Sequence, residues 1–119
     1  MNARTIAPAL AALIGAAVLA VPAGAKTFQI DVKVTNSSCK LALKAASVPN
    51  TAIDFHVINN GTIGHGILVW GVKSSIFAAK REGDLLVNFH KPGTFHYACT
   101  AGSYKHPKLF GRGVFTIRS

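Results

Sequence analysis

The chain has 119 residues, of which 13 are lysine or arginine and only 4 are aspartate or glutamate, so its formal net charge is +9. Four carboxylates supply general acid–base catalysis poorly, and no Ser/His/Asp set or phosphate-binding loop accompanies them, so we expect no enzymatic activity. The positive charge favours acidic partners, such as acidic protein faces or anionic lipid heads. Because the cations are scattered singly and accompany no nucleic-acid-binding motif, we expect no nucleic-acid partner.

The first 25 residues have the layout of a secretory signal peptide. Arg4 supplies a positive charge, an almost unbroken apolar run covers residues 6–21, and small residues at 23–25 offer a cleavage point. The apolar run is short for a membrane anchor. We therefore predict a signal peptide at 1–25, a single mature domain at 26–119 and a periplasmic or secreted location. No stable membrane span is expected after cleavage.

The mature chain alternates between apolar and polar residues, which is the period of half-buried β-strands. Turn signals rich in Asn, Gly and Pro separate the runs, for example at residues 48–50 and 59–62. Residues 74–81 form the only weakly helical patch. The expected strands lie within residues 28–34, 39–43, 53–57, 67–70, 85–89, 95–99 and 113–117. These seven short strands predict one all-β domain, a sandwich or a barrel.

The aromatic residues and most histidines have simple interpretations. The aromatic residues expected in the core are Trp70, Phe77, Phe89, Phe95 and Tyr97. His56 shares a strand face with Asp54, so we expect it to be solvated. His90 precedes a turn and His96 points away from its aromatic neighbours, so both are expected at the surface.

Two segments of the chain resemble the cupredoxin family. The first runs from Val48 through the turn at 59–62 to His65. The second begins with the turn at 91–94 and continues through an aromatic strand to Cys99, a later histidine and a closing strand at 111–117. The resemblance covers nearly the whole mature chain, and both segments occur in the family's order. It implies a Greek-key β-sandwich of about seven strands.

The resemblance also implies a copper site. In cupredoxins a histidine after the first turn and the cysteine and histidine of the C-terminal loop hold one copper ion; here these are His65, Cys99 and His106. A thiolate and two imidazoles suit a trigonal type 1 (blue) copper centre. The implied function is electron transfer or copper handling by an exported monomer. Its redox partner would be a protein with an acidic face, given the charge of the chain.

The C-terminal loop departs from the family's pattern at two points. The blue-copper loop usually ends in an axial methionine, but the only methionine here is Met1, which leaves with the signal peptide. Leu109 or Phe110 would stand there as an apolar wall, and Gly64 could offer its carbonyl oxygen from the other side. In addition, the interval from Cys99 to His106 is longer than in the usual loop.

The two cysteines leave a second interpretation open. An even number of cysteines in an exported protein favours a disulfide without requiring one. Cys39 and Cys99 resemble the cysteine pair of iron-uptake (EfeO-type) cupredoxin-like domains, which lack the ordinary blue-copper ligands. The alternative is therefore a structural or metal-uptake-associated module with a Cys39–Cys99 disulfide. Because a disulfide consumes the thiolate, the two interpretations exclude each other.

Overall fold

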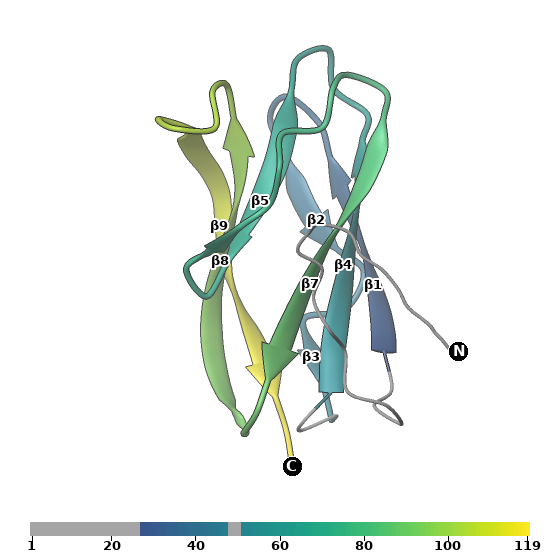
Figure 1. Ribbon diagram of the computed structural model, residues 1–119, viewed down its shortest axis with the longest axis vertical. Helices are drawn as coiled ribbons and strands as arrows, with labels where there is room; N and C mark the ends of the chain where they lie inside the picture. The colour runs from purple at the N-terminus through teal and green to yellow at the C-terminus, as the bar shows by residue number, and fades with distance from the viewer. Residues whose placement is uncertain (1–26, 48–50) are drawn as a thin grey trace, which may run out of the picture.

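The computed structural model describes residues 27–47 and 51–119, and this part of the chain consists of strands and loops (Figure 1). The predicted signal peptide and the predicted turn at 48–50 lie outside the described residues. The strands are β1 (Thr27–Val34), β2 (Cys39–Leu41), β3 (Ala45–Ala46), β4 (Thr51–Asn59), β5 (His65–Val69), β6 (Val72–Lys73), β7 (Glu82–Phe89), β8 (Gly93–Ala101) and β9 (Lys108–Ile117). No helix that could span a membrane occurs among these residues.

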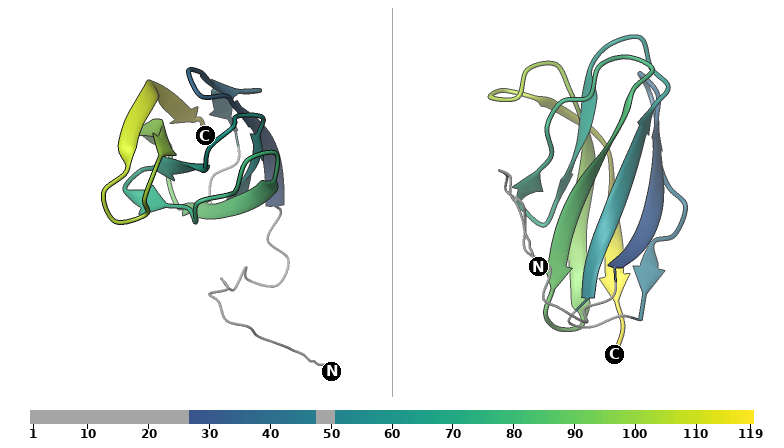
Figure 2. Two further views of the ribbon diagram at one scale, coloured as in Figure 1. Left: turned by 90° about the horizontal axis from the view of Figure 1, so that it is seen from above. Right: turned by 45° about the vertical axis from the view of Figure 1, so that its right-hand side comes forward.

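The strands form two sheets that face each other as layers (Figure 2). One sheet has the order β2-β1-β4-β7 and the other the order β3-β9-β8-β5-β6. The pairs β1–β4 and β3–β9 are parallel, and the remaining pairs are antiparallel. The all-β sandwich is confirmed. The two strands beyond the expected seven, β3 and β6, have two residues each, which is too short for an alternating pattern.

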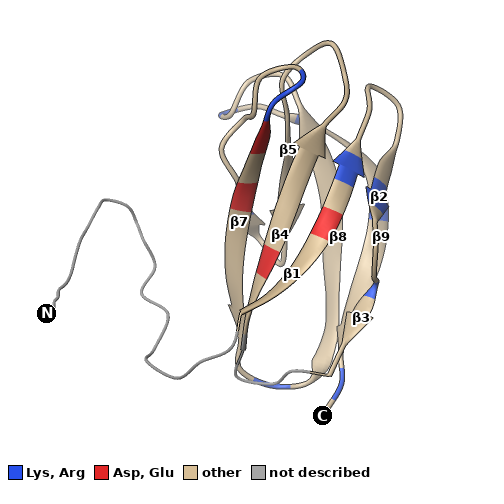
Figure 3. Ribbon diagram, turned by 90° about the vertical axis from the view of Figure 1, so that its right-hand side faces the viewer, with Lys and Arg blue, Asp and Glu red and all other residues tan. Residues whose placement is uncertain are grey.

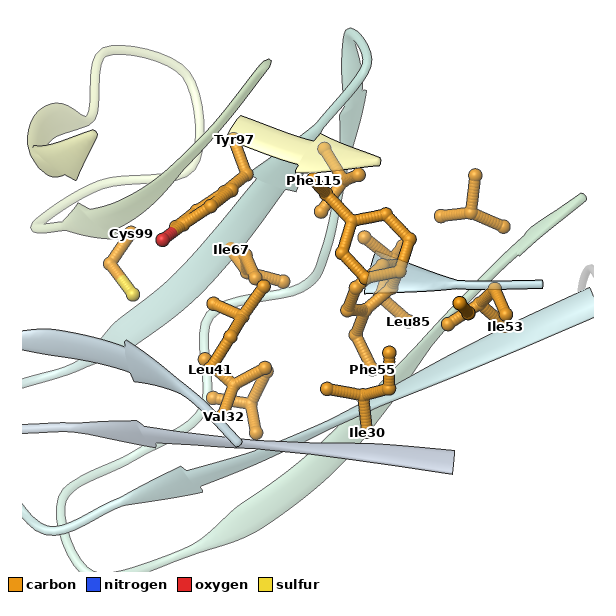
Figure 4. Packing of buried hydrophobic residues seen from close by; sticks show 14 of the residues in the cluster. Ile30, Val32, Leu41, Ile53, Phe55, Ile67, Leu85, Tyr97, Cys99 and Phe115 are labelled. Atoms are coloured by element: carbon orange, nitrogen blue, oxygen red, sulfur yellow. The ribbon is translucent and has the colours of Figure 1, made fainter. Parts of the chain in front are cut away.

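The core lies between the two layers and is filled by the apolar residues of alternating strand positions (Figure 4). Its largest fully buried side chains are Phe55, Phe89, Phe115, Ile30, Ile53, Ile67 and Ile117. The Phe55 ring meets the Phe115 ring edge-on, with 5.4 Å between the centroids. Of the aromatic residues expected in the core, Phe89 and Tyr97 are buried, while Phe77 and Phe95 pack against the core and are half-buried.

Trp70 is not in the core: the interpretation of Trp70 as a core residue was wrong. Trp70 and Gly71 connect β5 to β6 with φ angles of 51° and 76°, and 52% of Trp70 is exposed. A two-residue hairpin of this kind needs positive φ at both central residues, so the chain turns before the ring can enter the core. The ring instead covers the rim, stacked 5.9 Å from Phe89 and edge-on 5.0 Å from Phe95.

The expected weak helix at 74–81 does not form either. The segment is irregular, and Phe77 pairs with His65 as an isolated antiparallel bridge. The His65 N–H donates to the Phe77 carbonyl (3.1 Å), and the Phe77 N–H donates to the His65 carbonyl (2.8 Å). β6 pairs only with Leu68 and Val69, so Phe77 satisfies the backbone at the other end of β5. This tertiary pairing overrides a weak helical preference.

The two sheets differ in charge. All four carboxylates of the chain lie on strands of the four-stranded sheet: Asp31 on β1, Asp54 on β4, and Glu82 and Asp84 on β7 (Figure 3). The five-stranded sheet carries none, while Lys73, Lys108 and Arg112 lie on its strands.

Candidate functional site

Cys39 and Cys99 form a disulfide that links the two sheets near one end of the sandwich. Cys39 begins β2 and is half-buried, whereas Cys99 lies on β8 and is fully buried. The disulfide that the second interpretation requires is therefore present. In this state the sulfur of Cys99 is bonded to the sulfur of Cys39 and is not a free thiolate.

A local irregularity in β9 makes room for the disulfide. The register between β8 and β9 shifts between Tyr97 and Cys99. Gly111 has a φ of 63° in this part of β9, and a Cβ atom there would collide with the Cβ of Cys39. Only glycine combines this backbone conformation with such a close approach. Gly111 thus lets β9 pass in direct contact with Cys39, the disulfide cysteine on β2.

His65, the first residue of β5, is fully buried and both of its ring nitrogens have polar partners. Nδ1 lies 3.0 Å from the Thr100 carbonyl oxygen, and Nε2 lies 3.0 Å from Oδ1 of Asn36. The Phe110 ring packs edge-on against the imidazole, with 5.4 Å between the centroids. A metal ion at either nitrogen would have to displace a partner that is already in place.

Asn36 is itself held by the turn that precedes His65. The Thr62 N–H donates to Oδ1 of Asn36 (3.0 Å), and Nδ2 of Asn36 donates to the Thr62 hydroxyl (2.6 Å). Gly61 permits this arrangement, because a Cβ at position 61 would collide with the Asn36 amide and lie 2.9 Å from the His65 ring. The loop after β1 and the loop after β4 are thereby joined at His65.

Asn59, the last residue of β4, organises the same end of the molecule from inside. Its side chain is buried and accepts a hydrogen bond from the Gly61 N–H (2.8 Å). Its amide nitrogen contacts the carbonyl oxygens of Ile63 (2.9 Å), Phe77 (2.9 Å) and Ala78 (3.2 Å). One buried amide therefore satisfies backbone groups of the loop before β5 and of the segment before β7.

His106 differs from His65 in its environment, because it is exposed on the loop between β8 and β9. The backbone N–H of His106 donates to the Ser103 hydroxyl (3.2 Å). Lys73 fixes the middle of this loop: its Nζ donates to the Tyr104 carbonyl (2.6 Å) and lies 4.3 Å from the Tyr104 ring centroid. Within residues 27–47 and 51–119, no group of three or more His, Cys, Asp or Glu is arranged to hold a metal ion.

The donor set of a type 1 copper centre does not fit the disulfide-bonded state, because its thiolate is consumed. The copper site of His65, Cys99 and His106 stays a prediction for the reduced chain. The two residues of the predicted apolar wall lie in different places. Phe110 contacts His65, whereas Leu109 lines a groove on the outer face of the sheet.

The remaining histidines lie at the surface or near it. His90 and His96 are exposed, as expected. His56 is half-buried instead of fully solvated, with Nδ1 2.7 Å from Asp84 and Nε2 2.7 Å from Glu82. The hydrogen bond with Asp84, followed by that with Glu82, raises the pKa of His56 to about 9. Burial, followed by contact with Asp84, raises the pKa of Asp54 to about 6.

The sequence pattern places Asn36 between two expected strands and Asn59 in a turn, and it predicts no further role for either. Their structural role depends on which loops meet at His65, and the residues that meet are 29 and 18 positions apart for the contacts Asn36–His65 and Asn59–Phe77. The one local signal is the Asn59-Asn60-Gly61 run. It predicts a turn, because Asn and Gly tolerate unusual backbone angles, but not a buried amide.

Comparisons with known proteins show the fold. No protein-family model and no curated protein matches the chain. Among solved structures, the chain is similar to one described as "a heme-copper terminal oxidase dimer", with 14% identity and a TM-score of 0.54 over 82% of this chain and 68% of that chain. It is also similar to a multicopper oxidase, with 15% identity and a TM-score of 0.55 over 81% of this chain and 44% of that chain.

Both neighbours have cupredoxin-like folds, and the protein shares that fold. At these identities the likeness concerns the fold and not the site. The cross-linked sandwich with His65 at one end therefore has a cupredoxin-like fold. Its disulfide is typical of a protein from an oxidising compartment.

Proposed function

We propose that the protein is an exported, non-enzymatic cupredoxin-like module that works with its Cys39–Cys99 disulfide closed, in a structural or metal-uptake-associated role and without a blue copper centre. The observation that carries this proposal is the disulfide itself, because it occupies the sulfur that a type 1 centre needs. The state of His65 supports it: the ring is fully buried between the Thr100 carbonyl and the Asn36 amide, which favours a structural role for the imidazole.

A second candidate is electron transfer or copper handling by the reduced chain, with His65, Cys99 and His106 as ligands. One observation favours it. The pairing of β5 with β8 places His65 opposite Ala101 and Ile67 opposite Cys99, so two of the three ligands lie on adjacent strands at one end of the sheet. The similar structures also come from copper proteins. In this candidate, opening the disulfide releases the thiolate.

The first experiment is the mass of the purified mature protein without reductant. We expect a mass two hydrogens below that of the reduced chain. Cu(II) added to this protein should give no intense visible absorption, because no thiolate is available to bind it. An intense blue or green colour in the unreduced wild-type protein would contradict the proposal.

The Cys39→Ser variant separates the two candidates without a reductant, because it frees Cys99 while leaving both histidines in place. The matched control is Cys99→Ser, which also opens the disulfide but removes the thiolate. If the disulfide is structural, both variants stay colourless with Cu(II). If the second candidate is right, Cys39→Ser develops an intense visible absorption that Cys99→Ser lacks.

A further inference from the structure

The two sheets differ in charge on their outer faces, because the Asp and Glu residues all lie on the four-stranded sheet. On the four-stranded sheet the outward positions hold Asp31, Asp54 and His56, together with two apolar residues, Ile58 and Leu86. On the five-stranded sheet, Leu68 of β5 is paired with Ala98 of β8, and both lie on the outer face. Thr94 and His96 lie on the same face, so Leu68, Ala98 and the nearby Leu109 form an apolar strip within a mixed surface.

A groove of about 460 Å³ crosses this face over β5, β8 and β9. The lining residues that matter here are Leu68, Trp70, Phe95, Ala98, Leu109 and Arg112. Ala98 is only 3% exposed, although its strand position faces outward. Ala98 is therefore almost covered by its neighbours, and Leu68, Trp70 and Leu109 are the apolar lining residues that a partner can contact.

The groove is surrounded by positive charge alone. The five-stranded sheet has no carboxylate, and Arg112 lines the groove itself. Lys73 is paired with Leu68 on the neighbouring strand, and Lys91 lines an adjacent hollow that shares Trp70 and Phe95 with the groove. A partner that brings apolar side chains into the groove therefore gains from carboxylates that flank them.

We propose that this groove, defined by the six residues named above, is a docking surface for an acidic protein partner. The partner inserts a protruding aliphatic or aromatic side chain against Leu68, Trp70 and Leu109 and places flanking carboxylates near Arg112 and Lys73. The concave floor favours a protein segment over an anionic bilayer, which presents a broad face. The inference goes beyond the proposed function and does not depend on the state of the disulfide.

A second copy of the chain is a poorer occupant. Its carboxylates all lie on the four-stranded sheet, where Glu82 and Asp84 already contact His56 and where Lys33 and Lys40 add positive charge. A contact between unlike faces would also join copies head to tail without closing a dimer. The acidic surface must therefore come from another protein.

The test uses the ¹⁵N-labelled mature protein, with its disulfide intact, and a synthetic twelve-residue peptide in which leucine and phenylalanine alternate with glutamate and aspartate. The control peptide replaces every acid by its amide. We expect the acidic peptide to shift the amide signals of outward residues of β5, β8 and β9, with weaker binding at higher salt, and the amide peptide to bind far more weakly.

Two variants locate the binding. Arg112→Glu reverses an exposed charge in the groove, and Lys33→Glu makes the same change on the outer face of β1. We expect Arg112→Glu to weaken binding of the acidic peptide by about tenfold or more and Lys33→Glu to change it less than about twofold. Leu109→Asp tests the apolar floor, and its amide spectrum checks that the fold is kept.

Several outcomes would overturn the proposal. Signal shifts confined to the four-stranded sheet, or equal weakening by the two charge variants, would place the acidic partner elsewhere. Tighter binding to phosphatidylglycerol vesicles than to the acidic peptide, lost in Leu109→Asp, would make the groove a lipid surface. A dimer in sedimentation that Leu109→Asp dissociates would make it a contact between copies.

Discussion

His56 connects three strands through its side chain on the outer face of the four-stranded sheet. Its position is opposite Asp31 of β1 on one side and opposite Asp84 of β7 on the other. Both of its ring nitrogens contact carboxylates, of Asp84 and of Glu82. Since these partners favour the charged imidazole, the pKa of His56 rises from 6.5 to about 9.

This pKa predicts a defined loss of stability in mildly alkaline solution. A group whose pKa is higher in the folded state stabilises the fold below its unfolded pKa and loses that contribution as the pH passes its folded pKa. The free energy of unfolding should therefore fall between pH 6.5 and about pH 9 in the wild-type protein and much less in His56→Gln. Urea unfolding at pH 6.5, 8 and 9.5 measures it.

The pH window isolates His56 from its neighbour Asp54, whose pKa of about 6 lies below it. His90→Gln, which removes an exposed histidine from the turn before β8, is the control and should unfold like the wild-type protein. If His56→Gln and the wild-type protein lose stability in parallel across the window, the two carboxylates do not hold the charge of His56.

At the scale of elements, the end of the sandwich that carries His65 is organised by loops tied to one another. Asn59 contributes the central contacts, since its buried amide contacts groups of Gly61, Phe77 and Ala78 as well as Ile63. Hydrogen bonds between β4, the loop after it and the segment before β7 thus converge on one side chain.

Replacing Asn59 by alanine should destabilise the protein by about 3 kcal/mol, because the Gly61 N–H and the carbonyl oxygens of Ile63 and Ala78 lose their side-chain partner. Asn59→Asp should also destabilise it, since the carboxylate keeps the acceptor for Gly61 but faces the carbonyl oxygens that the amide had satisfied. Asn60→Ala is the matched control, because Asn60 is adjacent and exposed. Urea midpoints compare the three variants, and a loss below about 1 kcal/mol in Asn59→Ala would refute the role.

At the scale of the whole molecule, the disulfide is a side-chain cross-link between the layers, in addition to the loops that join them. It joins β2 of one sheet to β8 of the other across a separation of 60 residues. Elsewhere the layers are held by core packing, in which Phe55 of one sheet meets Phe115 of the other. The disulfide therefore constrains the part of the sandwich where β2, the edge strand of its sheet, has only three residues.

Loss of the disulfide should cost about 4 kcal/mol of stability, the loop-closure entropy expected for a 60-residue separation. The measurement compares urea unfolding of the oxidised protein with that of the protein reduced by a phosphine, at equal pH and salt. The same reductant on Cys39→Ser controls for effects unrelated to the disulfide and should change nothing. A difference below about 1 kcal/mol between oxidised and reduced wild-type protein would show that packing alone holds the layers.

Alternation along the chain predicted the strands that became β1, β4, β7, β8 and β9 because burial on one face of a strand repeats every second residue, a local property. The same local reasoning failed at Trp70. It assigned this last residue of an apolar run to the strand, whereas Trp70 is the first residue of the two-residue turn. It also failed at 74–81. There Phe77 pairs with His65 at the end of β5 that β6 does not cover, and this tertiary contact is absent from the local pattern.

For the candidate site too, some features follow from the sequence and others only from the tertiary structure. The sequence by itself determined the chemical types available, namely two cysteines, His65 and His106 in a cupredoxin-like order, and an excess of cations over four carboxylates. Only the tertiary structure decided that Cys39 meets Cys99, that Asn36 contacts His65, and that every carboxylate lies on one sheet. Strand patterns are set by neighbours along the chain, whereas these contacts follow from how the two sheets stack and which loops that stacking brings together.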